Sequence, residues 1–108
     1  MRIIKESTLT KLCERARYKK ADQAIRSWIF EVRNSDWNHA AELKAKYKGA
    51  SIISSKRVVF DICGNSYRLV VDIEYRIKIV FVVWFGTHSE YDNVDVNEVS
   101  YDSKSNKK

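Results

Sequence analysis

The first half of the chain carries apolar residues at the three- and four-residue spacing of amphipathic helices. One predicted helix has Ser7 as its N-cap and apolar positions at Leu9, Leu12, Cys13 and Ala16. A second predicted helix places on one face Ala21, Ala24, Ile25, Trp28 and Val32. A third, between the polar stop at residues 34–36 and Gly49, has apolar positions at Trp37, Ala40, Leu43 and Tyr47. Residues 2–5 ahead of these helices, with Ile3 and Ile4 inside them, form either a short strand or a lead-in.

After Ser55 the pattern changes to the two-residue alternation of β-strands. Arg57–Ile62 is one predicted strand, residues 63–66 form a turn, and residues 67–73 return as a second strand. A further turn at residues 74–76 precedes residues 77–85, which are nearly all apolar and typical of a central strand covered on both faces. This order predicts an α+β fold with N-terminal helices packed on an antiparallel β-sheet. The predicted domain covers residues 1–97, and residues 98–108 form a polar, basic C-terminal tail.

Composition narrows the possible partners. The chain has 108 residues and a net charge of +6, which favours a polyanion such as nucleic acid, although basic surfaces also serve solubility alone. We see no secretory leader, and the longest apolar run is too short for a membrane span, so we expect a cytoplasmic protein and no membrane partner. Cys13 and Cys63 have no metal-ligand spacing, and no cofactor motif occurs. We therefore expect reduced thiols, no cofactor and no metal.

The segment after the last strand, residues 86–92, concentrates proton donors and acceptors. His88 is suited to acid–base chemistry near neutral pH, and Glu90 and Tyr91 follow within one helical turn. The same residues can also form a capped helix start, with Thr87 as N-cap and Glu90 completing a capping box. The two interpretations are compatible, and neither excludes the other.

Basic and polar residues of the strands are the other candidates. Arg68 lies on the polar face of its strand and can hold a phosphate, or else it pairs with Asp61 or Asp72. Asn65 belongs to the turn, where it is either turn chemistry or an RNA ligand. Further cations that we consider for RNA or phosphate binding are Lys48, Lys56 and Arg57. The side chains that we assign to the core are Trp28, Trp37 and Trp84, and we expect His39 to be an exposed helix residue.

These segments together resemble the HigB family of toxins, within the RelE-like messenger-RNA interferases. The resemblance rests on the order of Arg57–Ile62, Gly64-Asn65, the Tyr-Arg-Leu-Val run at residues 67–70 and the segment at residues 86–92, supported by Trp37, Leu43 and Tyr47. It implies a RelE-like fold and an endoribonuclease that cleaves messenger RNA, often on the ribosome. It also implies a cognate antitoxin, usually a HigA-like helix-turn-helix protein, that neutralises the toxin.

The resemblance also implies roles for the candidates. Attack of a 2′-hydroxyl on the adjacent phosphate needs a base, cations and an acid. We expect His88 to act as acid or base, helped by Tyr91 or Glu90, while Arg68 holds the phosphate with Arg57, Lys56 and Lys48, and Asn65 orients the RNA. One alternative is a non-catalytic RNA- or ribosome-binding module, and another is a degenerate toxin kept as a protein-binding partner.

Overall fold

The structure is a computed structural model that describes residues 1–100, so most of the expected tail lies outside the described residues. Its elements, in chain order, are β1 (Arg2–Ile4), α1 (Glu6–Leu12), the 3₁₀ helix η1 (Ala16–Ala21), α2 (Asp22–Arg33), α3 (Ala40–Lys46), β2 (Ser51–Ile52), β3 (Arg57–Ile62), β4 (Tyr67–Glu74), β5 (Ile79–Thr87) and α4 (His88–Tyr91). This confirms the α+β class, with helices first and a strand meander afterwards.

The sheet is mixed rather than purely antiparallel. Its five strands lie in the order β1-β5-β4-β3-β2. The pairs from β2 to β5 are antiparallel, as expected for a meander, but β1 runs parallel to β5 and pairs with its first three residues, Ile79–Phe81. Because the N-terminal helices carry the chain away from β1 before the meander begins, β1 adds to the sheet with the parallel orientation. The apolar residues at the N-terminus are therefore a strand and not a lead-in.

The strand prediction was correct for β3 and shifted for β5. Residues 77–78 belong to the turn, and β5 runs from Ile79 to Thr87. It is also next to the edge strand, so β4 is the central strand of the five. Strand β5 is apolar because both of its faces are covered over much of its length. An apolar run therefore indicates burial of a strand and not its position in the sheet.

Two helix starts also differ from the prediction. Helix α1 begins at Glu6 because Lys5 has a left-handed backbone, with φ 73°, so Ser7 is inside the helix and does not cap it. Helix α3 begins at Ala40, and Trp37 precedes it as an irregular but buried residue. Trp37 packs edge-on against the Tyr47 ring. It is therefore apolar because it belongs to the core, although its spacing from Ala40 matched a helix.

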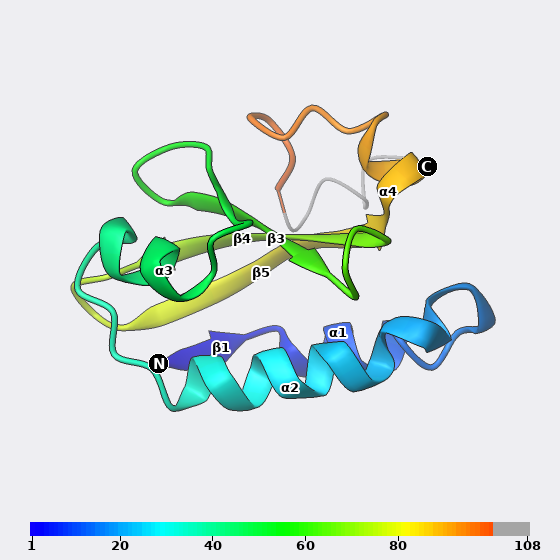
Figure 1. Cartoon of the computed structure of the whole chain (residues 1–108), viewed down its shortest axis with the longest axis horizontal. Helices are drawn as coiled ribbons and strands as arrows, with labels where there is room; N and C mark the ends of the chain where they lie inside the picture. Colours follow the sequence, from blue (N-terminus) through cyan, green and yellow to red (C-terminus); the bar gives the residue numbers. More distant parts are fainter. Residues whose placement is uncertain (101–108) are drawn as a thin grey trace.

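The sheet separates two apolar clusters. The larger cluster packs the helices against one face and includes Leu9, Ile25, Trp28, Leu43, Phe60 and Leu69, all at most 3% exposed. The smaller cluster lies on the opposite face, where Val59, Val70 and Val83 are covered by Trp84, Tyr91, Val96 and Val99. Figure 1 shows α2 along one face and α4 with the chain that follows it on the other. Trp28 and Trp37 are core residues as expected, whereas Trp84 is only partly buried.

The first residues of the expected tail are attached to this second face. Val99 packs in the smaller cluster, although it belongs to the segment that we expected to be frayed. The remaining positions of that segment, residues 101–108, lie outside the described part of the chain. None of the helices in residues 1–100 is long and apolar enough to cross a membrane.

The β3–β4 turn determines which residues face each other across the hairpin. Residues 63–66 connect the strands, and positive φ angles occur at Cys63 (56°) and Gly64 (68°) rather than at the expected Gly-Asn pair. The resulting register sets Asp61 opposite Arg68 and Arg57 opposite Asp72. The turn therefore decides which carboxylate each arginine meets.

Candidate functional site

Arg68 is the centre of a polar cluster at the end of β4. Its Nε lies 3.3 Å from the Asp61 carboxylate, and its Nη2 donates to the Asn65 side-chain oxygen at 2.7 Å. The guanidinium also lies 5.9 Å from the centre of the Tyr91 ring, within cation–π distance. With 14% of its side chain exposed, Arg68 is held in one orientation at the surface. Of the two ion pairs considered from the sequence, the structure forms the one with Asp61.

His88 lies beside this cluster because two neighbouring strands place it there. Gly86 is the cross-strand partner of Arg68, and His88 follows two residues later as the first residue of α4. The His88 backbone amide donates to the Ser66 carbonyl in the β3–β4 turn at 2.9 Å, which ties α4 to the turn that also carries Asn65. The imidazole is 47% exposed, and its Nδ1 lies 3.7 Å from the Asp92 carboxylate. The strand pairing and the short helix α4 thus place an exposed imidazole at the end of the sheet that also carries Arg68.

Glu90 has a structural environment. Thr87 and Glu90 form the predicted capping box, because the Glu90 amide donates to Thr87 Oγ1 at 3.1 Å and the Thr87 amide donates to Glu90 Oε1 at 2.9 Å. Tyr18 and Arg17 also donate to the carboxylate, at 2.9 and 2.6 Å. Burial acts to raise the pKa of Glu90, but the bonds from Thr87 and Tyr18 and the charge of Arg17 outweigh it and lower that pKa. The carboxylate is therefore ionised and fully engaged in holding α4 against η1.

Lys48 lies in the loop that approaches the same cluster. A Cβ placed on its neighbour Gly49 would lie 3.2 Å from Asp61 Oδ2, so this loop runs directly over the carboxylate that binds Arg68. The loop is held by Lys44, whose ammonium donates to the Lys48 carbonyl at 2.8 Å. The Lys48 side chain itself is exposed. Lys48 is thus the sequence neighbour of the residue that approaches the Arg68–Asp61 ion pair.

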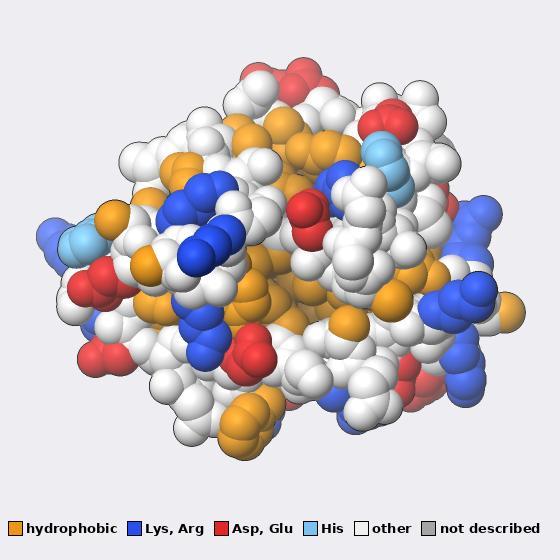
Figure 2. All heavy atoms as spheres, in the orientation of Figure 1, with side chains coloured by type: hydrophobic (Ala, Val, Ile, Leu, Met, Phe, Trp, Pro, Cys, Tyr) orange, Lys and Arg blue, Asp and Glu red, His pale blue; other side chains and the backbone are white. Residues whose placement is uncertain are grey.

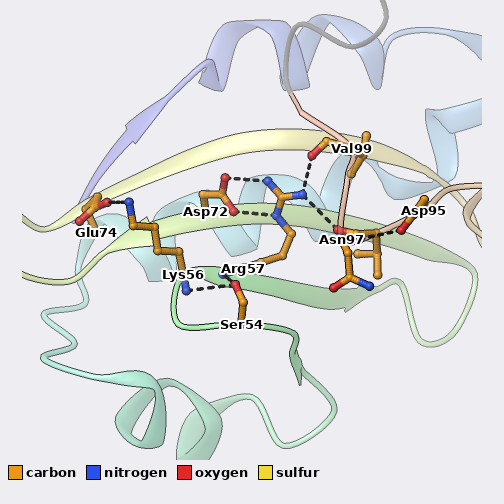
Figure 3. A network of polar contacts seen from close by, with 9 residues as sticks. Ser54, Lys56, Arg57, Asp72, Glu74, Asp95, Asn97 and Val99 are labelled. Carbon is orange, nitrogen blue, oxygen red and sulfur yellow. Dashed lines mark hydrogen bonds and ion pairs between the residues drawn. The ribbon is translucent and has the colours of Figure 1, made fainter.

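The structure does not bring Arg57 and Lys56 into this cluster. Arg57 and Asp61 are at opposite ends of β3, about 13 Å apart at the usual rise of a strand. Both Arg57 bonds to the Asp72 carboxylate are 2.7 Å long, and its Nη1 also donates to the carbonyls of Val96 and Val99 (Figure 3). Lys56 pairs with Glu74 beside it. Arg57 fastens the segment after α4 to the sheet, and the role of both cations in RNA binding stays a prediction.

The cluster around Arg68 is an open surface rather than an enclosed pocket. A groove of about 460 Å³ lies along β5 and α1, and a hollow of about 220 Å³ lies near Lys56 and Arg57, but the lining of neither includes His88 or Arg68. Figure 2 shows basic side chains gathered over α3 and its following loop, and a histidine at the position of α4 with a basic and an acidic side chain beside it.

Residues to which the sequence interpretation gave no part in catalysis complete this arrangement. Asp61 holds Arg68, and strand alternation made it one of two possible partners. Tyr18 and Arg17 hold Glu90 from 72 and 73 residues away, and no local pattern marks them. Asp92 faces His88 one helical turn later, a spacing that does place two side chains on one face. Among residues 1–100 there is no group of three metal-ligating side chains that could hold an ion.

Fold and cluster together define the class of this protein. It is a small basic α+β protein whose helices cover one face of a mixed sheet, while the other face carries an arginine, a histidine and a tyrosine at one end. A search of curated proteins finds no match. A family model described as the HigB toxin, the RelE-like toxic component of a toxin–antitoxin system, matches residues 21–94, more than half of the chain. The chain therefore belongs to the HigB toxin family.

Proposed function

We propose that this protein is an endoribonuclease that cleaves messenger RNA on the ribosome and is neutralised by a helix-turn-helix antitoxin. Membership of the toxin family establishes a toxin with an antitoxin partner, and the finer activity is our proposal. One observation carries it: an exposed histidine follows two residues after the cross-strand partner of Arg68, whose guanidinium lies against the Tyr91 ring of the same short helix.

In this proposal Arg68 and Lys48 bind the scissile phosphate and neutralise charge that develops on it. The Arg68 guanidinium is oriented by Asp61 and Asn65, so little reorganisation is needed when the charge appears. Lys48 approaches from the loop over Asp61. Removing one such fixed donor typically lowers the rate of the chemical step by about 10²–10³-fold.

His88 moves the proton, as base toward the 2′-hydroxyl or as acid toward the leaving 5′-oxygen. Its ring is 47% exposed, and the Asp92 carboxylate lies 3.7 Å from Nδ1, so Nε2 is the nitrogen that we assign to the proton transfer. The Tyr91 ring lies against the Arg68 guanidinium, and in this proposal the Tyr91 hydroxyl assists His88 in proton transfer. Attack of the 2′-hydroxyl leaves a 2′,3′-cyclic phosphate on one fragment and a 5′-hydroxyl on the other.

Glu90, Arg57 and Lys56 have supporting parts. Glu90 positions α4, and therefore His88, because its carboxylate accepts hydrogen bonds from the Thr87 amide, the Tyr18 hydroxyl and the Arg17 guanidinium. Arg57 begins β3 and fixes the segment after α4, while Lys56 precedes the strand and pairs with Glu74. In this proposal both present charge to RNA or to the ribosome away from the reacting phosphate.

The test compares the chain's two histidines. His88→Gln should lower the rate of transcript cleavage by about 10²–10⁴-fold, the usual contribution of a general acid or base, and should relieve growth arrest. His39→Gln is the matched control, since His39 is also exposed beside a carboxylate, that of Glu42, but lies at the start of α3. Primer extension after brief expression maps the new 5′ ends.

Arg68→Lys should lose cleavage while Arg26→Lys, an exposed arginine on α2, keeps it. Circular dichroism shows whether each variant is folded. Full cleavage by a folded His88→Gln would refute the assignment of His88. Growth arrest by the parent protein without any new 5′ ends would favour the non-catalytic binding module instead.

A further inference from the structure

Most of β5 has no strand beside it on the side of β1. Strand β1 pairs only with Ile79–Phe81, whereas β5 continues to Thr87. The left-handed backbone of Lys5 ends β1 and turns the chain off the sheet, so that α1 begins at once. Within residues 1–100, no strand continues β1 along residues 82–87. Such an edge presents backbone donors and acceptors to which another strand can pair.

A groove follows this open edge. It has a volume of about 460 Å³, and its walls come from α1, from the chain just after α1 and from residues 82–85 of β5. Leu9, Leu12 and Trp84 give it an apolar surface, and residues of α1 line it together with residues 82–85 of β5. A single extended backbone therefore has both a pairing edge and an apolar floor here.

The charge of the groove selects its occupant. Lys11 and Arg15 line the wall opposite the edge, both are exposed, and neither forms an ion pair within the described part of the chain. Side chains of alternate residues in a strand point in opposite directions, so one row would face these cations while the other packs on the apolar floor. The complementary segment alternates acidic and apolar residues.

We propose that an acidic, extended segment of the antitoxin adds as a strand to β5 along residues 82–85. The inference rests on the antitoxin partner of the proposed function and is independent of RNA cleavage. A polypeptide fits better than RNA because a strand edge rewards main-chain hydrogen bonding, which a sugar–phosphate backbone cannot supply in register. This surface differs from the Arg68 cluster, since none of the residues that line the groove belongs to that cluster.

The direct test uses isotope-labelled full-length protein and an acetylated octapeptide of alternating Glu and Val as the probe. Nuclear magnetic resonance titration should shift the backbone amides of residues 82–85 and of α1. The same peptide with Lys in place of Glu should bind at least about tenfold more weakly, as expected for a few exposed ion pairs. Shifts confined to the surface around Arg68, or no shifts at millimolar peptide, would overturn the proposal.

Charge reversal gives a second, matched comparison. The double variant Lys11→Glu, Arg15→Glu should lose about tenfold in affinity for the acidic peptide and gain affinity for the Lys peptide. Lys19→Glu with Lys20→Glu makes the same change of charge on η1, outside the groove lining, and should leave both affinities nearly unchanged. Equal loss in the two double variants would mean that net charge, and not the groove, binds the peptide. Preferential movement of the same amides by an octauridylate would assign the groove to RNA instead.

Co-expression with the product of the adjacent gene tests the partner. The Lys11→Glu, Arg15→Glu variant should still arrest growth alone, because its Arg68 cluster is intact, but the antitoxin should neutralise it less well than the parent. Undiminished neutralisation would refute the groove as the antitoxin's docking surface. If the parent itself arrests no growth, the proposed toxic activity fails, and the peptide titration decides the groove separately.

Discussion

Gly86→Ala tests whether the site depends on a position where any side chain collides. A Cβ at Gly86 would lie 2.6 Å from Trp84 Cη2 and 2.7 Å from both Trp84 Cζ2 and Glu90 Oε1. Ordinary carbon contacts are about 3.5–4.0 Å, so the overlap is close to 1 Å on two sides. Gly86 is also the cross-strand partner of Arg68, so any displacement occurs beside the polar cluster.

The cost follows from what must move. If the indole swings away, it leaves its contact with Tyr91 and its place over the Val70 cluster, and such aromatic pairs are worth about 0.5–1.5 kcal/mol. If the carboxylate moves, the capping box of α4 is lost, at about 0.5–2 kcal/mol. Together with the usual cost of overpacking, about 1–3 kcal/mol, we expect roughly 2–4 kcal/mol of destabilisation. In a domain of this size that corresponds to a fall in Tm of about 10–25 °C.

The other two glycines calibrate the measurement. At Gly64 a Cβ meets nothing within 4 Å, but its φ of +68° makes Gly64→Ala cost about 1 kcal/mol through backbone strain alone. At Gly49 the nearest atom is a movable carboxylate oxygen at 3.2 Å, so Gly49→Ala should stay within about 1 kcal/mol of the parent. Urea unfolding followed by circular dichroism gives the three values. If Gly86→Ala costs less than Gly64→Ala, the packing argument is refuted.

Three further outcomes are expected. Arg57→Met should destabilise by about 2–4 kcal/mol in urea unfolding, because it strands the partly buried Asp72 carboxylate and releases two carbonyls, and an unchanged midpoint would contradict this. Cys63 should react with a thiol reagent in the native state while Cys13 does not, because burial first of all raises the pKa of Cys13 to about 11; early double labelling would refute it. Since the lowered pKa of Glu90 adds stability above its unfolded value of about 4.3, the advantage of the parent over Glu90→Gln should disappear as pH falls below about 4 in pH-dependent melts, and a pH-independent difference would contradict it.

Local patterns predicted the features that depend on neighbouring residues. Strict alternation fixed β3 at Arg57–Ile62, and the spacing of Thr87 and Glu90 anticipated the capping box that starts α4. Alternation also placed Asp61 and Asp72 as possible partners of Arg68, but only the register could choose between them. That register depends on the turn at residues 63–66, whose positive φ angles fall one residue earlier than a Gly-Asn turn would put them.

Features that join distant segments were beyond the sequence pattern. Strand β1 has three residues, too few to show a period, and its parallel pairing with β5 depends on how α1 and α2 carry the chain. The bonds of Tyr18 and Arg17 to Glu90 span more than seventy residues, so local spacing left the catalytic and the capping interpretations of Glu90 side by side. Arg57 shows the same limit, since the Val99 carbonyl that binds it belongs to the expected C-terminal tail and the Val96 carbonyl lies just before that tail.

Strand β5 connects the polar cluster and the open edge through one side chain. Trp84 lines the groove, and its indole lies 6.1 Å from the Tyr91 ring, which in turn lies 5.9 Å from the Arg68 guanidinium. A strand seated on the edge would contact Trp84 directly and could therefore displace Tyr91 without covering the site. Tyr18 of η1 also lines the groove, and its hydroxyl donates to the Glu90 carboxylate that completes the capping box of α4. The groove therefore shares two side chains with the contacts around α4, because Trp84 meets Tyr91 and Tyr18 meets Glu90.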